Sequence, residues 1–412
     1  MNELSRSLRN TFFALAILST SFASAHDFEV DGIYYNKTSD TEVSVTYRGD
    51  YYDSYSKEYT GDVIIPSTVS YNSVEYSVTT IGSSAFSGCS GLTSVSIPNS
   101  VTSIGKSAFI ACYGLTSVTI PNSVTSIGEE AFWGCSGLDS VTIGNSVTKI
   151  GERAFMVCIG LTSVTIGNSV IEIGLAAFWG CSGLTSVTIP NSVITIGQQA
   201  FDRCFGLTSV TIGNSVTTIG FSAFWGCSGL TSVTIGNSVT SVGDCAFIGC
   251  DGLTSVTIGN SVTSIGGYAF RGCYGLTSVT IPNSVTKIGD YAFFGCYGLT
   301  SVTSLAITPP SIYKDSFDTE TIEIGILYVP ADAVNDYKTA PNWRYFGNIQ
   351  SITSGIDEIA AEENEGIDFN AEVDIYTLNG TQVYTGPRSE ARLAKGLYLV
   401  RQGAAVTKVY VE

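Results

Sequence analysis

The sequence predicts a β-rich solenoid in which ten coils of 23 residues, each with parallel strands and a short helical turn, stack between two caps and precede a small C-terminal β-module. Ten of the eleven cysteines recur every 23 residues, and only Cys245 is out of step. Each unit also repeats the apolar pattern AF-x-x-C-x-x-L-x-x-V-x-I-(P/G)-N-S-V-x-x-I-G. One such coil cannot bury its apolar side chains alone, so the repeat requires stacking.

Each coil is expected to contain two extended pieces and one turn. Val187 and Ile189 alternate with Ser186 and Thr188, which predicts a strand with one buried face and one solvated face. The following Pro or Gly with Asn-Ser turns the chain. Val193–Ile196 forms a second extended piece, and Gly197 permits a tight bend. Ala200 and Phe201 then begin a short helical turn.

The N-terminus is predicted to be a signal peptide. Arg6 and Arg9 precede the apolar run Phe12–Leu18, and cleavage is expected between Ala25 and His26. The apolar run is too short to span a bilayer, and no later segment approaches the required length. We therefore predict a secreted protein.

Composition divides the rest of the chain. Gly is abundant at 44 residues, charged residues make up 13%, and the net charge is −17. No basic stripe is present to neutralise phosphates, so nucleic acid is not expected as a partner. The predicted segments are 1–25 (signal peptide), 26–80 (N-terminal β cap), 81–303 (solenoid), 304–353 (C-terminal cap), 354–371 (acidic linker) and 372–412 (β-module).

The repeated cysteines are interpreted as a structural ladder of compact apolar side chains at an inner corner. They are Cys89, Cys112, Cys135, Cys158, Cys181, Cys204, Cys227, Cys250, Cys273 and Cys296. Disulfides between adjacent coils remain an alternative, although parallel side chains hold the Cβ atoms farther apart than a disulfide prefers. A zinc site is not expected, because no C-x-x-C type spacing occurs.

Two sets of surface residues are candidates for binding a partner. The first is a pair of hydroxyl rows on the outward strand face, from Ser117 to Ser278 and from Thr119 to Thr280; it includes Ser186, Thr188, Ser209, Thr211, Ser232 and Thr234. The second is Trp133, Trp179 and Trp225, which recur every 46 residues. Aromatic side chains of this kind anchor proteins or stack on sugars. The simpler interpretations are a soluble strand surface and tryptophans that cover a neighbouring coil.

No enzymatic activity and no cofactor are expected. The single histidine, His26, lies at the predicted mature N-terminus, so Ser-His-Asp and Cys-His arrangements lack a base. Glu129, Glu130 and Glu152 are interpreted as solvated side chains of the turn. No phosphate-binding, dinucleotide-binding or calcium-binding motif is present.

The strand pattern L-x-x-V-x-I matches the leucine-rich repeat signature. The unit AFxxCxxLxxVxIPNSVxxIGxxAF resembles the repeats of BspA-like surface proteins from Bacteroidetes-type bacteria, over Ile81 to about Val302. The segments DFEVDGIYYN and LYVPADAVNDYKTAPNWRYFGNIQSI resemble the caps of the same family. This resemblance implies display at the outer cell surface and adhesion to a host or bacterial surface protein or glycan.

The C-terminal module resembles the sorting domain of the type IX secretion system, through four short extended runs from Val373 to Glu412 with a turn at Asn379-Gly380. This resemblance implies a contact with the secretion machinery. The alternative is an ordinary β-module.

Two other functions are compatible with the repeat. One is self-association into a surface layer, for which the oligomeric state is the test. The other is an ice-binding lattice formed by the Ser/Thr rows, although leucine-rich repeats curve and ice-binding faces are flat. Near-identical coils give no single position a special environment, so the repeat does not identify the ligand.

Overall fold

The computed structural model describes residues 26–49, 58–352, 372–377, 382–387, 396–402 and 405–411. The predicted signal peptide and acidic linker lie outside these residues. The chain forms two compact units. The first comprises the described residues up to Val193 together with Arg203–Phe205, and the second comprises Ile194–Asp202 and the described residues from Gly206 onward.

The first unit begins with a small β cap. Its strands are β1 (Phe28–Val30), β2 (Ile33–Lys37), β3 (Glu42–Thr46), β5 (Thr68–Tyr71) and β6 (Val74–Ile81). β1, β2 and β3 are antiparallel neighbours, and β5 forms a hairpin with β6. β3 and β6 pair in parallel, which changes the antiparallel cap into the parallel arrangement of the coils.

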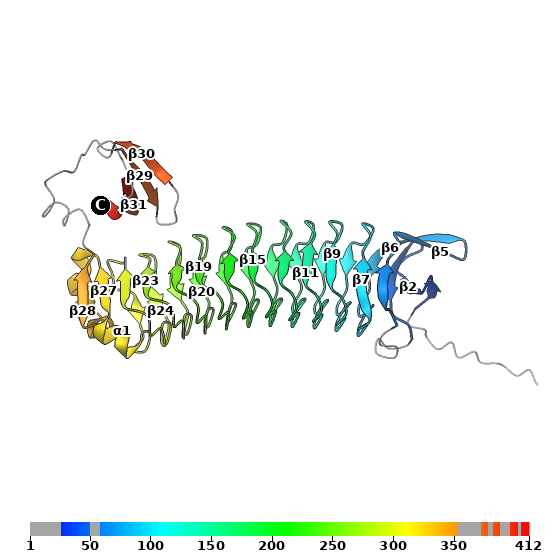
Figure 1. Ribbon diagram of the computed structural model, residues 1–412, viewed down its shortest axis with the longest axis horizontal. Coiled ribbons are helices and arrows are strands. Elements are labelled where there is room, and N and C mark those ends of the chain that lie inside the picture. Colours follow the sequence, from blue (N-terminus) through cyan, green and yellow to red (C-terminus); the bar gives the residue numbers. More distant parts are fainter. Residues whose placement is uncertain are drawn as a thin grey trace, which may run out of the picture. The chain divides into compact units, whose positions relative to one another are not determined.

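Two parallel strand rows follow in the first unit (Figure 1). The longer strands are β4 (Gly61–Ile64), β7 (Leu92–Ser96), β9 (Ser117–Ile120), β11 (Ser140–Ile143), β13 (Ser163–Thr165) and β15 (Ser186–Thr188). The shorter strands are β8 (Ser103–Ile104), β10 (Ser126–Ile127), β12 (Lys149–Ile150) and β14 (Glu172–Ile173), which continue the sheet of β6. Equivalent residues pair in register, as Val118 does with Val141, so each sequence position forms a straight row across the coils.

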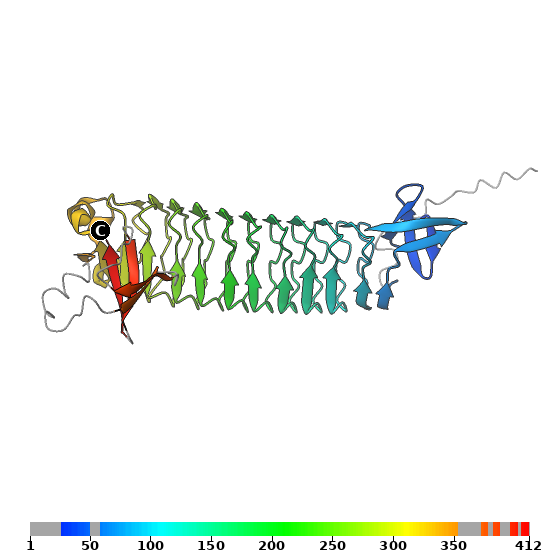
Figure 2. The same ribbon diagram turned by 90° about the horizontal axis from the view of Figure 1, so that it is seen from above.

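The second unit repeats both rows (Figure 2). Its longer strands are β17 (Ser209–Thr211), β19 (Ser232–Thr234), β21 (Ser255–Thr257), β23 (Ser278–Ile281), β25 (Ser301–Ser304), β27 (Ile326–Val329) and β28 (Asn348–Ser351). Its shorter strands are β16 (Thr195–Ile196), β18 (Thr218–Ile219), β20 (Ser241–Val242), β22 (Ser264–Ile265), β24 (Lys287–Ile288) and β26 (Ser311–Ile312). Short helices accompany the last coils: α1 (Thr319–Ile324), η1 (Ala331–Ala333), α2 (Val334–Thr339) and η2 (Trp343–Tyr345).

The predicted solenoid is confirmed, with about 12 turns of 23-residue spacing. The sequence predicted ten, because the caps lack the cysteine period. β4 pairs with β7 in parallel at one end, and β27 and β28 continue the parallel row after β25 at the other. The caps therefore add turns to the solenoid.

The predicted short helical turn is wrong, because this segment consists of hydrogen-bonded turns. The backbone amides of Ser107, Phe109 and Ala111 donate to carbonyl oxygens of the next coil at 2.7–2.8 Å. Ser107 has a φ of 54°, and the equivalent residue has positive φ in all ten coils. A right-handed helix cannot continue through a left-handed residue. The amides thus form a third row of bonds between coils.

The glycine that ends each coil is required by close packing and not by an unusual φ. A Cβ atom on Gly151 would lie 2.4 Å from the carbonyl oxygen of Gly128 in the preceding coil. The sequence interpretation of a tight bend at Gly197 therefore identified the right residue type for a different physical reason.

Stacked phenylalanine rings form the core. In the first unit the rings of Phe86, Phe109, Phe132, Phe155 and Phe178 lie 4.8–5.2 Å apart with nearly parallel planes. The second unit repeats this from Phe201 to Phe317, at 5.2–5.3 Å. The apolar residues of the strands and turns are buried around the rings, as predicted.

Large aromatic residues close both ends of these stacks. The ring of Tyr59 lies 4.6 Å from Phe86, and its hydroxyl donates to the carbonyl oxygen of Thr46 at 2.8 Å. In the second unit Trp343 packs 5.8 Å from Phe317, and its indole N–H donates to the carbonyl oxygen of Pro310 at 2.7 Å. Each end is covered by an aromatic side chain whose polar atom has a partner, as a solenoid terminus requires.

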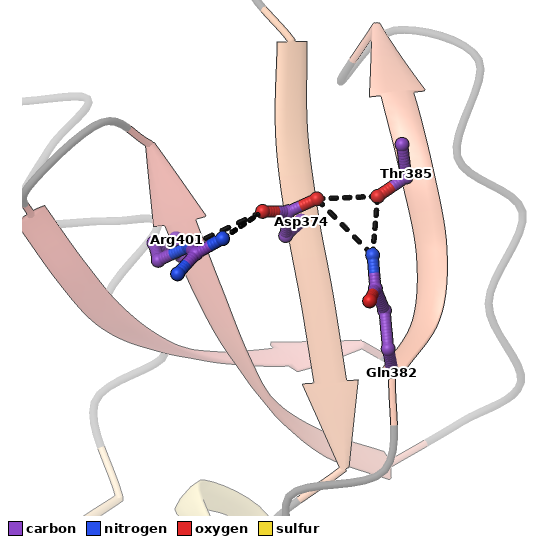
Figure 3. Close-up of polar contacts among 4 residues, drawn as sticks. All are labelled: Asp374, Gln382, Thr385 and Arg401. Atoms are coloured by element: carbon purple, nitrogen blue, oxygen red, sulfur yellow. Dashed lines mark hydrogen bonds and ion pairs between the residues drawn. The ribbon is translucent and has the colours of Figure 1, made fainter.

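A small antiparallel sheet follows at the C-terminus, in the order β30-β29-β31-β32. The strands are β29 (Glu372–Thr377), β30 (Gln382–Pro387), β31 (Gly396–Gln402) and β32 (Ala405–Val411). Val373, Ile375 and Val400 are buried together. The other face of β29 carries Asp374, which pairs with Arg401 at 2.5 Å and accepts hydrogen bonds from Gln382 and Thr385 (Figure 3).

Candidate ligand-binding surfaces

The outward strand face of the first unit presents hydroxyl groups without internal partners. The side chains of Ser117, Thr119, Thr142, Ser186 and Thr188 are exposed, and none of them hydrogen-bonds to another described residue. The pleat explains the exposure, since Val118, Val141 and Val187 between them point into the core. Ser209, Thr211, Ser232 and Thr234 are equally exposed in the second unit.

A neighbouring threonine row behaves differently. The hydroxyl of Thr162 lies 2.8 Å from the carboxylate and 3.2 Å from the carbonyl oxygen of Asp139, and the hydroxyl of Thr254 donates to the carbonyl oxygen of Thr231 at 3.1 Å. These threonines lie just before the longer strands and satisfy backbone carbonyls between coils. Exposed hydroxyls thus fall into a structural row and a row that remains available to a ligand.

The available row lines a groove of about 740 Å³ on the first unit. Ser117, Thr119 and Thr142 contribute hydroxyls, and Ile97, Ile120, Pro121 and Ile143 contribute apolar surface; the other lining residues are Ser94, Val95, Ser96, Asn99, Asn122, Gly144, Asn145 and Thr165. No charged side chain lines the groove. The arrangement offers many neutral hydrogen-bonding groups over an apolar floor.

An asparagine ladder forms one rim of the groove. The side-chain oxygen of Asn122 accepts a hydrogen bond from the backbone N–H of Asn145 at 2.7 Å, and Asn145 in turn accepts one from Asn168 at 3.0 Å. The sequence interpretation treated these residues only as turn formers. The signal was present, because Asn recurs every 23 residues from Asn99 to Asn283, whereas the preceding residue is Pro in some coils and Gly in others.

A carboxylate of the cap lies near the strand face. Asp62 on β4 accepts hydrogen bonds from Ser94 at 2.7 Å and from Thr93 at 2.8 Å. These bonds hold the pKa of the Asp62 carboxyl below its usual value, with Ser94 the larger cause. Asp62 therefore carries a negative charge near the N-terminal end of the hydroxyl row. The sequence interpretation missed it, because it lies in the cap.

All eleven cysteines lie in the described residues and are free thiols. The ladder thiols point inward, and from Cys112 onward each donates to a phenylalanine carbonyl of the preceding coil, as Cys158 does to Phe132 at 3.1 Å and Cys135 to Phe109 at 3.0 Å. Cys89, in the first coil, donates to the carbonyl oxygen of Ser87. Burial raises the pKa of the Cys158 and Cys181 thiols well above their ordinary value. These thiols are therefore poor nucleophiles and metal ligands.

The predicted tryptophans lie in the turns before the cysteines, and none of them lines the groove. Trp133 and Trp179 are half-buried, whereas Trp225 is 38% exposed. The guanidinium carbon of Arg203 lies 5.2 Å from the centre of the Trp179 ring. Trp179 thus contacts a neighbouring coil, as the simpler interpretation of these residues expects.

The BspA type leucine-rich repeat region, a model of six copies, matches residues 66–185 and 172–300, which together make up more than half of the chain. The chain belongs to this family. Its match begins within the N-terminal cap and ends within the last regular coil. No curated protein sequence matches the chain.

Solved structures similar to this BspA-type chain include three bacterial proteins. A leucine-rich cell surface protein from Faecalibacterium prausnitzii is 26% identical, with 82% of this chain and 98% of that chain covered and a TM-score of 0.44. A leucine-rich repeat protein from Bacteroides ovatus is 29% identical, with 68% and 94% covered and a TM-score of 0.36. The pneumococcal vaccine antigen PcpA is 18% identical, with 79% and 96% covered and a TM-score of 0.44.

Charged residues of the BspA-type repeats form surface ion pairs. Glu129 contacts Lys106 at 2.9 Å and Arg153 at 3.5 Å, and Glu130 contacts Arg153 at 3.7 Å. Glu152 is exposed. Exposed pairs of this kind contribute about 0–1 kcal/mol each. The arrangement is that of solvated turn residues.

No arrangement for metal or membrane binding was found in the described residues of this BspA-type chain. They contain no group of three or more His, Cys, Asp or Glu side chains placed to hold a metal ion, and no helix among them is long and apolar enough to cross a bilayer. His26 packs its ring edge-on against Tyr34 at 4.8 Å. Ala25, on the other side of the predicted cleavage site, lies outside the described residues.

Proposed function

We propose that this BspA-type protein is displayed at the bacterial cell surface, where the hydroxyl rows of its strand face bind a surface protein or a glycan of a host or another bacterium. The observation that carries the proposal is that these hydroxyls are exposed and lack internal partners, while the adjacent threonine row is used between coils. A neutral, hydroxyl-rich groove with an apolar floor suits an uncharged polymer or a polar peptide.

Surface display is supported by the family and by the chain ends. The predicted signal peptide directs export, and the four-stranded C-terminal sheet occupies the region that resembles a type IX sorting domain. We propose that the protein is exported by the type IX secretion system of a Bacteroidetes-type cell. Deletion of residues 372–412 in the native host should abolish display, as measured by surface immunolabelling, and unchanged labelling would contradict it.

The protein is proposed to act by binding and not by catalysis. The family is not known for catalysis. The thiols of the ladder are buried, and the one histidine packs against a tyrosine at the edge of the cap. No cofactor is required for binding through hydroxyls and amides.

The strand face is tested by a matched pair of substitutions in one coil. Thr142→Arg places a long charged side chain in the groove, whereas Thr148→Arg places it on an exposed residue directly before β12, outside the groove. Capture of host-cell surface extract by the full chain should fall at least about tenfold for Thr142→Arg and stay within about twofold for Thr148→Arg. Equal capture by both variants would refute a role for the groove.

A further inference from the structure

The turns of the second unit carry a cluster of aromatic side chains that the strand face does not explain. Tyr268 and Tyr291 stack with ring centres 5.0 Å apart, and Phe294 meets Tyr291 edge-on at 5.3 Å. In the next row, Tyr274 and Tyr297 stack at 5.7 Å and are 53% and 64% exposed. We call these five residues the tyrosine patch.

Both rows of the tyrosine patch belong to the same two coils. Tyr268 and Tyr274 lie in consecutive turns of one coil, and the Tyr274 hydroxyl lies about 4.0 Å from the position that a Cβ atom would take on Gly272. The Tyr274 side chain therefore reaches back to the end of the turn that contains Tyr268. Tyr113 and Phe205 are the equivalents of Tyr274 in two other coils, but only the last two of the ten coils have an aromatic residue at the positions of both Tyr268 and Tyr274.

Four aspartates lie in the coils of the patch or in the coils next to them. The Asp244 carboxylate accepts a hydrogen bond from the backbone N–H of Gly267 at 2.7 Å, beside Tyr268 in sequence. Asp251 holds the repeat position of Tyr274 one coil earlier, and its backbone carbonyl oxygen accepts a hydrogen bond from the Gly275 N–H at 3.2 Å. Asp315 and Asp290 both act on Tyr291 and raise the pKa of its hydroxyl, with Asp315 the larger cause.

Positive charge at the patch is limited. Arg271 lies with its guanidinium carbon 5.6 Å from the centre of the Tyr268 ring. Lys314 in the following coil acts on Tyr345, whose hydroxyl pKa it helps to lower. The carboxylates therefore outnumber the cations around the patch, and the chain as a whole carries a net charge of −17.

We propose that the tyrosine patch is a docking surface for a lysine- or arginine-rich segment of a partner protein. Ring faces attract guanidinium and ammonium groups, and the surrounding carboxylates pair with the same groups. The contact between Arg271 and Tyr268 is an internal example of this geometry. The patch extends over two coils and two turn rows, which matches several cationic side chains of one segment.

The carboxylates disfavour other occupants. Nucleic acid and other polyanions are repelled by four aspartates. A sugar ring stacks on a free aromatic face, but in each stacked pair the two tyrosines cover one face of each other. A cationic side chain can also form ion pairs with the carboxylates, whereas a neutral sugar cannot. This docking surface lies in the turns and stands independently of the function proposed for the strand face.

The aromatic contribution is tested with a fluorescent oligo-arginine peptide and the full chain, by anisotropy at low salt. The double variant Tyr274→Ala with Tyr297→Ala should bind about tenfold more weakly. Tyr113→Ala is the matched control, because Tyr113 has the same repeat position and is 56% exposed in the first unit. Circular dichroism checks that each variant is folded. No binding of the peptide by the wild type, or equal binding by all variants, would overturn the proposal.

The charge contribution is tested by a second matched pair. Asp290→Asn with Asp315→Asn should weaken oligo-arginine binding about fivefold or more, whereas Asp139→Asn with Glu152→Gln, which changes the net charge equally in the first unit, should have little effect. Equal losses in the two double variants would mean diffuse attraction and would refute a docking site. Binding of a neutral cello-oligosaccharide that is lost with Tyr274→Ala and Tyr297→Ala, while oligo-arginine binding persists, would assign the patch to glycans instead.

Discussion

The buried corner of a coil and its outward strand face follow the same period but have different roles. In one coil, Phe155 and Cys158 are completely buried, and the Cys158 thiol bonds to the preceding coil. Ser163 and Thr165, a few residues later, are exposed and have no side-chain partner among the described residues. Repetition therefore shows that the coils are equivalent, and the partners of each side chain show whether its row stabilises the fold or remains available.

The largest expected effect concerns the whole thiol ladder. Burial raises the pKa of Cys135, Cys158, Cys181 and Cys250, whereas unfolded thiols lose their protons above about pH 8.5. Above that pH the unfolded state binds fewer protons, so the free energy of unfolding should fall by about 1.4 kcal/mol per pH unit for each such thiol. Urea unfolding followed by circular dichroism between about pH 8 and pH 10 measures this. A flat profile over this range would contradict buried thiols.

Truncation of one stacked ring should have the next largest effect. Phe155 lies 5.1 Å from Phe132 and 5.2 Å from Phe178, so Phe155→Ala leaves a cavity between two coils. The expected loss is about 3–5 kcal/mol in the free energy of unfolding. Ile159→Ala, in the same coil but at a side chain that is 50% exposed, is the control and should cost well under half as much. Similar urea midpoints for the two variants would refute the inward assignment.

A single rung of the cysteine ladder should contribute less. Cys158→Ala removes a buried sulfur and the donor to the Phe132 carbonyl, which should cost about 1–3 kcal/mol. Cys245 is half-buried and outside the ladder, so Cys245→Ala should cost less than about 1 kcal/mol. The Cys158 variant should also show a shallower loss of stability at alkaline pH. A larger cost for Cys245→Ala would reverse the comparison.

The smallest effects separate the two hydroxyl rows. Thr162→Ala removes a donor to Asp139 and should cost about 0.5–1 kcal/mol. Thr142→Ala removes an exposed hydroxyl without a partner and should change the free energy of unfolding by less than about 0.5 kcal/mol. Thermal unfolding of the two variants against wild type makes the measurement. An equal cost would show that the strand-face hydroxyls are also structural.

The structure of the coil was predictable, because the sequence pattern that determines it lies within each coil and recurs in every coil. The alternation around Val187 and Ile189 predicted the strand, and both side chains are buried. The turn before Cys112 was not predictable as a helix or a turn, because its amides bond to the next coil, and a pattern in one coil contains no information about that partner. The same reason applies to the cysteine thiol and to the asparagine oxygen, whose acceptor and donor lie one coil away.

The candidate sites were harder to predict than the fold. The hydroxyl rows were found from their spacing, but their availability depends on which threonines are used between coils. Tyr268 and Tyr291 were missed, because they occupy a variable position that other coils fill with serine, glutamate, arginine, alanine, glutamine or cysteine. Only the register of the coils shows that these two tyrosines are neighbours.

That variable position has a further consequence. In all ten coils a residue with a side chain occupies this position in the left-handed backbone conformation, which glycine adopts at lower energetic cost. The backbone conformation at this position therefore favours glycine over any residue with a side chain. Even so, the residue type changes from coil to coil, and the backbone keeps the same conformation. The repeat therefore presents one variable side chain per coil, about 5 Å from its equivalent in the next coil. This side chain can change while the backbone of the solenoid stays the same.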